Sequence, residues 1–309
     1  MKLVVVMATY NGAPYIDEQI HSIIAGELQP SRLVIRDDRS CDKTLELAKK
    51  LAASTTSDVE FDIKKNKTSL GAARNFLSTL NEIPSDTDFV AFSDQDDIWK
   101  PWKLKRAVRF LSENQIGDQP ALYCSRQQLV DEQGHSIKLS PDYSHQPSFS
   151  NVLVENIATG CTTLINRRAL NIVQELSHPL PDIEFHDWWL NLIISGVGGK
   201  VIFDSKPSIK YRQHSNNVRG ARTSLYTGLK MRIKRQVSGQ LKNQIERNIK
   251  AAAKVDNKFT PTNRKQLEAF QKARKGNIAQ RANYLRTASI YRQTRMDDLI
   301  MKILLLAGA

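Results

Sequence analysis

Three carboxylates stand within four residues of one another in the sequence SDQDDIW at positions 93–99. The apolar residues just before them predict a buried strand over residues 89–93. Asp94, Asp96 and Asp97 repel one another and lose solvation next to such a strand, and a hard divalent cation would offset their charge. This segment therefore predicts a metal site with oxygen ligands.

Two other interpretations apply to the same segment. A calcium-binding EF-hand loop would need glycine at its sixth position and glutamate at its twelfth, where this chain has Trp99 and Lys105. An EF-hand is therefore excluded. A solvated acidic turn that caps a helix opening at Pro101 stays open, because carboxylates stabilise helix N-termini.

A second acidic segment, DDRSCDKT, occupies positions 37–44 and follows another predicted strand. A carboxylate at a strand end can accept hydrogen bonds from a ribose or from a pyrimidine ring N–H. Asp42 could equally cap the helix that follows it. The segment indicates a nucleoside site or a helix cap.

Alternating strands and helices must position these side chains. The expected strands cover residues 3–8, 33–36, 59–63 and 89–93, and the helices that follow them cover 14–25, 42–53, 71–80 and 101–114. This alternation predicts a largely parallel sheet covered by helices, in which ligands bind beyond the carboxyl ends of the strands. Thr9, Asn11, residues 37–38 and residues 94–97 all follow strand ends, so we expect them to share one cleft.

The next part of the chain predicts further elements of the same domain. We expect a strand over residues 122–125, a hairpin turn over 131–134 and a helix over 185–195 that carries Asp187. Two strands, over 200–203 and 208–211, should be separated by Pro207, because proline cannot donate a hydrogen bond to a sheet.

Four segments together resemble the family-2 glycosyltransferases of the GT-A fold. They are MATYNG at positions 7–12, DDRSCDKT at 37–44, LGAARN at 70–75 and SDQDDIW at 93–99. The resemblance covers about residues 1–220. It implies an α/β fold of GT-A type, with a Rossmann-like, mostly parallel mixed sheet flanked by helices.

Three segments are similar to a bacterial rhamnosyltransferase-like subgroup of that family. They are SDQDDIW at 93–99, FHDWW at 185–189 and YRQHSNN at 211–217. Most of the wider family has Glu where His186 stands, before the catalytic Asp. Whether His186 contacts the acceptor or merely flanks Asp187 stays open.

The resemblance also implies roles for individual residues. Mg²⁺ or Mn²⁺ would be held by Asp96, with Asp97 and His214 as further candidate ligands, although His214 could instead be an ordinary core or loop histidine. Asp187 would take the proton of the acceptor hydroxyl, and a single base without an enzyme nucleophile implies inversion at the anomeric carbon. A nucleotide-diphosphate sugar would be bound by a further set of residues: Thr9, Asn11, Asp38, Arg74 and Asp94.

The positive charge of the chain is concentrated near its C-terminus. Residues 221–309 hold 20 Lys and Arg against 5 Asp and Glu, a net charge of +15, whereas residues 1–220 carry −2. We therefore divide the chain into a catalytic domain over 1–220, with a nucleotide-sugar half (1–115) and an acceptor half (116–220), and a basic, α-helical C-terminal extension over 221–309.

The extension should form several helices. Apolar residues recur every four positions from Leu225 to Ile249, and we expect a break near Gly239, because such a stripe drifts around a 3.6-residue helix. A further helix should begin at Thr262 and end at Gly276.

The charge of the extension predicts an anionic membrane surface as partner. The candidate contacts are Lys234, Arg235, Lys242, Arg247 and Lys250. A solvated face or a homo-oligomer interface is the alternative. Nucleic acid is disfavoured, because the extension has few aromatic residues for base stacking.

The remaining sequence features concern location. The three cysteines fit neither a disulfide framework nor a zinc site, which favours a reducing, cytoplasmic environment. We expect no signal peptide, and the apolar stretch over 299–309 is far shorter than the ~20 residues of a membrane span. The expected place is the inner face of the cell membrane, peripherally bound.

The sequence hypothesis is an inverting, metal-dependent transfer of a single sugar in cell-surface polysaccharide synthesis. The donor would be dTDP-rhamnose, with UDP-sugars second, and the acceptor a glycan or a lipid-linked saccharide. The alternatives are a catalytically silent sugar-nucleotide-binding or scaffold protein and, third, a nucleic-acid binder.

Overall fold

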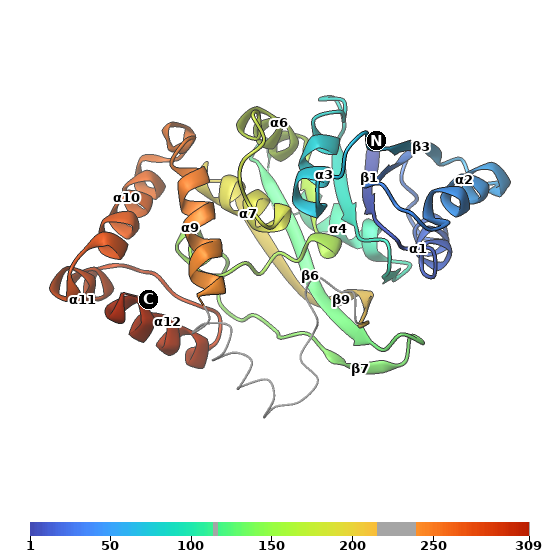
Figure 1. The fold of residues 1–309 in the computed structure, drawn as a ribbon. Coiled ribbons are helices and arrows are strands. Elements are labelled where there is room, and N and C mark those ends of the chain that lie inside the picture. Colours follow the sequence, from blue (N-terminus) through green and yellow to red (C-terminus); the bar gives the residue numbers. More distant parts are fainter. Residues whose placement is uncertain (114–116, 215–238, 309) are drawn as a thin grey trace.

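The N-terminal part of the chain alternates strands and helices, as the sequence predicts. The computed structural model describes residues 1–113, 117–214 and 239–308, and Figure 1 shows their arrangement. The first elements are β1 (Leu3–Thr9), α1 (Ile16–Ile24), β2 (Arg32–Asp37), α2 (Thr44–Ser54), β3 (Glu60–Lys65), α3 (Ala72–Leu80), β4 (Phe89–Ser93), β5 (Ile98–Trp99) and α4 (Lys103–Glu113).

The second part adds strands of both directions. It contains β6 (Ala121–Val130), β7 (Ser136–Leu139), α5 (Phe149–Val152), a 3₁₀ turn η1 (Gly160–Thr162), β8 (Leu164–Asn166), α6 (Arg167–Leu176), α7 (His186–Gly196) and β9 (Lys200–Arg212). The hairpin predicted over residues 131–134 joins the antiparallel strands β6 and β7. The helix predicted over 185–195 is α7.

All strands of the described chain form one mixed sheet. Its order is β3-β2-β1-β4-β8-β6-β9-β5, with β7 paired to β6. Strands β1 to β4 are parallel, β8 is antiparallel to β4 and β6, and β6 runs parallel to β9. The carboxyl ends of β1, β2 and β4 therefore lie at one edge of the sheet, where ligands are expected.

The prediction of two separate strands around Pro207 is wrong. Residues 200–212 form the single strand β9, and its register with β6 shifts after the Ser125–Asp204 pair, so that Gln127 pairs with Ile209. The extra residues form a bulge, and Pro207 lies within it, where its missing N–H breaks no regular ladder.

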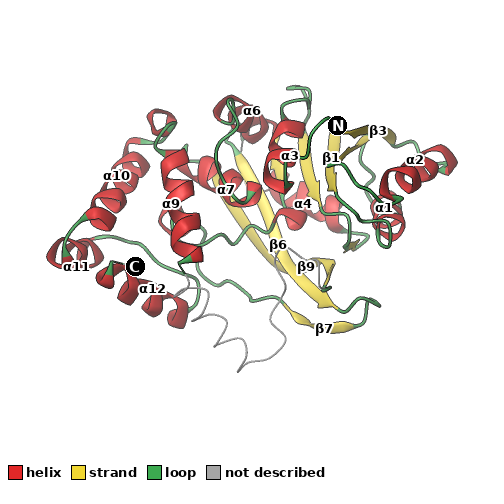
Figure 2. Cartoon of the chain, in the orientation of Figure 1, coloured by secondary structure: helices red, strands yellow, loops and turns green. Residues whose placement is uncertain are grey.

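Helices cover both faces of the sheet (Figure 2). On one face, residues of α1, α2 and α4 such as Ile20, Ala48 and Leu104 form a core with the sheet. On the other face, α3, α6 and α7 contribute Phe76, Leu170 and the tryptophans of α7 to a larger core. The three-layer α/β class predicted from the sequence is confirmed.

The C-terminal extension is helical, as predicted. It contains α9 (Gln240–Ala252), η2 (Asp256–Lys258), α10 (Pro261–Lys275), α11 (Ile278–Thr287) and α12 (Arg295–Ala307). These helices gather at the end of the molecule opposite to α1 and α2 (Figure 1). Among the described residues, no helix combines the length and the hydrophobicity that crossing a membrane requires.

The extension continues the core of the catalytic domain rather than forming a separate one. Ile245 and Ile249 on α9 and Phe270 on α10 are buried in the core that includes α7. Helix α9 begins after its left-handed N-cap Gly239, where the second segment of the stripe was expected to start. Leu225 and the first half of the stripe lie outside the described residues, so the break itself stays a prediction. The helix expected to end at Gly276 is α10.

Candidate active site

The acidic loop between β4 and β5 is fixed to the end of β1 by Gln95. The Oε1 atom of Gln95 accepts a hydrogen bond from the Tyr10 N–H at 2.8 Å, and the Nε2 atom of Gln95 donates to the Tyr10 carbonyl at 2.9 Å. A Cβ atom at Gly12 would lie 2.3 Å from the Gln95 amide, so this approach requires glycine. The β1 turn and the acidic loop therefore form one rigid unit. No pattern in the sequence indicated this role of Gln95.

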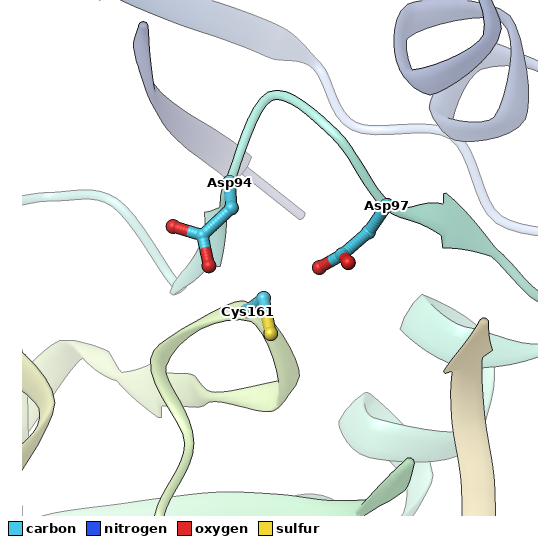
Figure 3. A group of neighbouring side chains, drawn as sticks. All are labelled: Asp94, Asp97 and Cys161. Atoms are coloured by element: carbon cyan, nitrogen blue, oxygen red, sulfur yellow. The ribbon is translucent and has the colours of Figure 1, made fainter. Parts of the chain in front are cut away.

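Two of the predicted carboxylates turn toward the same side of this loop. Figure 3 shows Asp94 and Asp97 facing the region of Cys161, and the ligand atoms of the three residues lie within 4.8 Å of one another. Asp97 Oδ2 is buried and has no hydrogen-bond partner within the described chain. A buried, unpartnered carboxylate oxygen beside a second carboxylate fits a divalent cation.

The pKa values of the carboxylates reflect this crowding. Burial, and then repulsion from Asp96 and Asp187, raises the pKa of Asp94 to about 7. Burial, followed by Asp96 and Asp94, raises the pKa of Asp97 well above its ordinary value. Burial also raises the pKa of Asp96, although a hydrogen bond with His214 opposes the shift. A positive charge placed among these carboxyl groups would lower their pKa values and favour the ionised forms.

Asp96 lies against the end of β9. Its Oδ2 is 2.9 Å from His214 Nε2, and the His214 ring stacks on Tyr15 with centroids 4.9 Å apart. Arg212 donates through Nε to the Asp96 carbonyl at 3.0 Å and through its backbone N–H to Asp97 Oδ1 at 3.3 Å. The structure therefore brings the predicted metal residues Asp96 and His214 into contact, and Asp97 beside Asp94.

A buried lysine lies near the two carboxylates and contacts Cys161. Lys103 Nζ donates to the Cys161 carbonyl at 2.7 Å and lies 4.1 Å from the centre of the Trp99 ring. Burial lowers the pKa of Lys103 to about 8, while the nearby Asp97 and Asp94 oppose that shift. Lys103 therefore adds a positive charge that partly balances the carboxylates. Nothing in the sequence pattern distinguished it from the other lysines of its helix.

Asp187 lies at the N-terminus of α7 and is held at both oxygens. Oδ2 accepts a hydrogen bond from the Gly160 N–H at 3.0 Å, and Oδ1 accepts one from the Trp188 N–H at 2.6 Å. The 3₁₀ turn η1 connects Asp187 with the acidic loop, because Gly160 donates to Asp187 and the next residue, Cys161, lies within 4.8 Å of the ligand atoms of Asp94 and Asp97. Two N–H donors and a helix N-terminus stabilise an ionised carboxylate, which is the form that a general base needs.

His186 packs behind Asp187. Its ring stacks on Phe76 with centroids 3.9 Å apart, it is buried, and its Nε2 has no hydrogen-bond partner among the described residues. Burial lowers the pKa of His186 to about 4, so the ring is neutral near pH 7. A Cβ at Gly160 would lie 2.7 Å from Nε2. Of the two roles left open by the sequence, this packing favours a residue that flanks Asp187.

Thr9 and Asn11 lie at the end of β1 and organise the neighbouring loop. Thr9 Oγ1 donates to Asp37 Oδ2 at 3.0 Å. Asn11 adopts a left-handed φ of 50°, and its Oδ1 accepts a hydrogen bond from the Cys41 N–H at 2.9 Å. Asp42 accepts from the Thr44 N–H at 3.0 Å, but the N-cap residue of α2 is Lys43 and no side chain caps the helix, so the helix-cap interpretation of Asp42 is wrong. The polar residues of β1 and β2 thus meet, as predicted.

Asp38 has all its acceptor positions occupied. Oδ1 accepts hydrogen bonds from Asn66 Nδ2 (2.9 Å) and the Leu70 N–H (2.7 Å), and Oδ2 accepts from Ser69 Oγ (2.9 Å) and the Gly71 N–H (2.8 Å). Burial alone would raise the pKa of Asp38, but these four bonds outweigh it and lower the pKa. In this structure Asp38 therefore shapes the loop over residues 66–71.

Arg74 lies in the first turn of α3, directly after that loop. Its side chain is exposed, and the N-cap residue Gly71 has a φ of 74°, which favours glycine. A helix N-terminus with an exposed arginine attracts anions such as a diphosphate. The Asp38 network positions this helix start relative to β2.

The mixed sheet, with helices on both faces and acidic residues at one edge, belongs to the α/β class. A comparison with models of protein families identifies the family of the chain. Residues 4–172 match the model of Glycosyl transferase family 2, so the chain belongs to this family and is a glycosyltransferase. Within it, the chain is 32% identical to the dTDP-rhamnosyl transferase RfbG of Shigella flexneri over 231 residues, which cover 71% of this chain and 75% of the relative.

Another relative acts on a different donor according to its name. The UDP-Glc:alpha-D-GlcNAc-diphosphoundecaprenol beta-1,3-glucosyltransferase WfaP of Escherichia coli is 24% identical over 71% of this chain and 80% of its own length. Some relatives are much longer: the match to an uncharacterized glycosyltransferase of Rickettsia conorii, at 24% identity, covers 68% of this chain but 34% of that relative.

Solved structures confirm the GT-A-type fold. TarS of S. aureus in complex with UDP-GlcNAc superimposes with a TM-score of 0.57 at 17% identity, over 100% of this chain and 87% of that chain. The mannosyltransferase PcManGT of Pyrobaculum calidifontis, in complex with GDP-Man and Mn²⁺, gives 0.54 at 18% identity, over 99% of this chain and 78% of that chain.

Proposed function

We propose that the chain transfers a single sugar, with inversion and with the help of Mg²⁺ or Mn²⁺, from a nucleotide-diphosphate sugar to a glycan or lipid-linked acceptor in cell-surface polysaccharide synthesis. The observation that carries the proposal is the position of η1: its Gly160 donates to Asp187, and its Cys161 lies within 4.8 Å of the ligand atoms of Asp94 and Asp97. The similarity to RfbG favours dTDP-rhamnose as donor, with a UDP-sugar second.

The residues present fit a divalent metal. Asp94, Asp96 and Asp97 supply the hard oxygen ligands that Mg²⁺ and Mn²⁺ prefer, and the unpartnered Oδ2 of Asp97 lacks a donor among the described residues. Burial raises the pKa of the Cys161 thiol well above its ordinary value, so the carboxylates are better ligands than this sulfur. A bound divalent ion would act as a Lewis acid and stabilise the charge of the leaving diphosphate.

The other roles in the reaction belong to side chains of the protein. Asp187, oriented by the N–H groups of Gly160 and Trp188, takes the proton of the attacking hydroxyl. Arg74, at the start of α3, attracts the diphosphate. Thr9, Asn11 and Asp38 maintain the loops that receive the nucleoside. Because one base acts without a covalent sugar–enzyme intermediate, the anomeric configuration inverts.

One relative and the charge of the extension support the acceptor and the place of action. The name of WfaP includes a diphosphoundecaprenol-linked sugar, which supports a lipid-linked acceptor for this chain as well. Such acceptors lie at a membrane, and the net charge of +15 over residues 221–309 supports peripheral attachment to an anionic leaflet on the cytoplasmic side.

Donor hydrolysis across a panel of nucleotide sugars tests the proposal. The panel contains dTDP-rhamnose, UDP-glucose, UDP-GlcNAc and GDP-mannose, each with Mg²⁺, Mn²⁺ or EDTA. We expect the fastest release of dTDP from dTDP-rhamnose, and its loss with EDTA. Binding of a donor without turnover, once glycan acceptors are added, would instead support the silent sugar-nucleotide-binding protein. The NMR coupling constants of the product then report inversion or retention.

A further inference from the structure

Helix α12 is apolar on two opposite sides. Met301 and Leu305 are buried against the rest of the protein, with exposed fractions of 7% and 5%. Met296, Leu299 and Ile303 are 51–55% exposed. At 100° per residue these three fall within an arc of about 60°, on the side roughly opposite to Leu305. The helix therefore presents a continuous apolar stripe, Met296–Leu299–Ile303, away from the core.

This stripe is unusual for the surface of the chain. Eight large hydrophobic side chains are exposed in the described residues, and four of them lie on α11 and α12: Ile278 and the three residues of the stripe. Contiguous exposed apolar patches mark sites of interaction. The stripe therefore indicates a partner.

The chemistry around the stripe indicates what that partner is. Arg295 and Lys302 lie about 20° apart on one flank of α12, and Lys302 forms an ion pair with Asp298 at 2.7 Å. A groove lined by Leu305 and Gly308 together with Lys242, Lys250, Arg274 and Lys275 lies on the opposite side of α12, so its cations add to the positive charge of the extension but do not border the stripe. An apolar stripe bordered by cations is the pattern of a helix that lies in the plane of a membrane interface.

We propose that α12, with α11, is an in-plane anchor that inserts Met296, Leu299 and Ile303 into the surface of an anionic bilayer. A second copy of the chain is the less favourable occupant, because a symmetric dimer through this stripe would bring together two extensions of net charge +15. An anionic leaflet attracts the same charge. The anchor deepens the proposed function and rests on it, since it would hold the active site beside an acceptor that is carried on a lipid.

The position of the anchor differs from the one that the sequence predicted. Of the cations expected to contact the membrane, Arg247 forms an ion pair with Asp182 at 2.6 Å, and Lys242 donates to the Gly308 carbonyl at 3.1 Å. Lys234 and Arg235 lie outside the described residues. The structure assigns the apolar contacts with the membrane to α12. In the sequence, part of this helix was noted only as the apolar stretch over 299–309, which is too short to span a bilayer.

Co-sedimentation with lipid vesicles tests the anchor. The double variant Leu299→Glu/Ile303→Glu should reduce partition onto vesicles with 30% phosphatidylglycerol, at about 0.1 M salt, by at least ~10-fold, since two apolar groups no longer leave water. The matched control is Ile137→Glu/Leu139→Glu, which changes two exposed apolar residues of β7 and should partition like the wild type. Phosphatidylcholine vesicles should bind all three proteins weakly.

Two outcomes would overturn the anchor. One is a wild type without preference for anionic vesicles, or a double variant that partitions as the wild type does. The other is a wild-type dimer, measured by light scattering, that the double variant converts to monomer while vesicle binding stays the same. If the double variant does not fold, Leu299→Trp replaces it: brominated lipids should quench its fluorescence more than that of the wild type, and equal quenching refutes insertion.

The same proteins separate this proposal from the proposed function. Donor hydrolysis in solution needs no membrane, so the double variant should keep the wild-type rate of dTDP release. A wild type that binds vesicles without hydrolysing or transferring any donor contradicts the proposed function and leaves the anchor standing. Full transferase activity without vesicle binding supports the proposed function and refutes the anchor.

Discussion

Replacement of Asp187 by Asn removes the proposed base while keeping the size of the side chain. Asp187 receives two N–H donors, from Gly160 at 3.0 Å and from Trp188 at 2.6 Å. Asn has one oxygen, so one of these donors would face the Asn NH₂ group. The unmatched buried donor costs about 1–3 kcal/mol of the free energy of unfolding. The variant should therefore still fold, with a lower melting temperature.

The effect on the reaction should be larger than the effect on stability. Loss of a general base lowers the rate by about 10²–10⁴, equivalent to roughly 3–5 kcal/mol of activation free energy. Donor affinity should stay close to the wild-type value, because the proposed role of Asp187 concerns the acceptor proton. The predicted signature is a transfer rate reduced at least ~100-fold with a nearly unchanged Kd for the donor.

The assay combines single-turnover transfer with calorimetric titration of the donor in the presence of Mn²⁺. The control is Asp182→Asn, which removes the same charge at an exposed position five residues earlier and should keep the wild-type transfer rate. Equal losses of transfer and of donor affinity would refute the reasoning, because they would place Asp187 at the metal or the nucleotide. A wild-type transfer rate would refute it as well.

Three further predictions concern the donor side of the site. Asp96→Ala should abolish metal-stimulated donor hydrolysis and weaken donor binding; wild-type turnover that still requires metal would contradict this. Asp38→Ala leaves the N–H groups of Leu70 and Gly71 without their acceptor. Steady-state kinetics should therefore show that the KM for the donor rises by a larger factor than kcat falls. A change in kcat alone would count against this prediction. The pKa of Asp94 is raised to about 7, so its stabilising contribution is complete below about pH 4 and is lost as the pH rises through 7. The melting temperature of the metal-free protein should therefore fall between about pH 4 and 7, and Mn²⁺ should restore it more at pH 7 than at pH 4. Equal stabilisation by Mn²⁺ at both pH values would speak against a metal at Asp94.

The gathering of polar residues at one edge of the sheet was predictable. Parallel strands share a direction, so the residues after β1, β2 and β4 had to meet once the alternation of strands and helices was recognised. Thr9, Asp38 and Asp94 are therefore where the sequence predicted them. Their hydrogen bonds were not predictable, because the donors to Asp38 come from a loop about 30 residues away in the chain.

The residues that reach the site from other elements could not be recognised from any pattern in the sequence. Lys103 contacts the carbonyl of Cys161 across 58 positions of sequence, and Gly160 meets Asp187 across 27. Such contacts depend on how α4, η1 and α7 pack on the mixed part of the sheet. In that part the direction of a strand does not follow from alternation alone, and the bulge around Pro207 has the same origin.

The close approach of Gly160 to His186 constrains how this protein can evolve. Any side chain at position 160 collides with the imidazole, whose Nε2 would lie 2.7 Å from the new Cβ. A single mutation there would be purged, whereas the same mutation in a lineage that already carries a smaller residue at 186 would survive. The two positions should therefore be inherited as a pair. Because the Gly160 N–H also donates to Asp187, a pair of substitutions at 160 and 186 would have to keep this hydrogen bond.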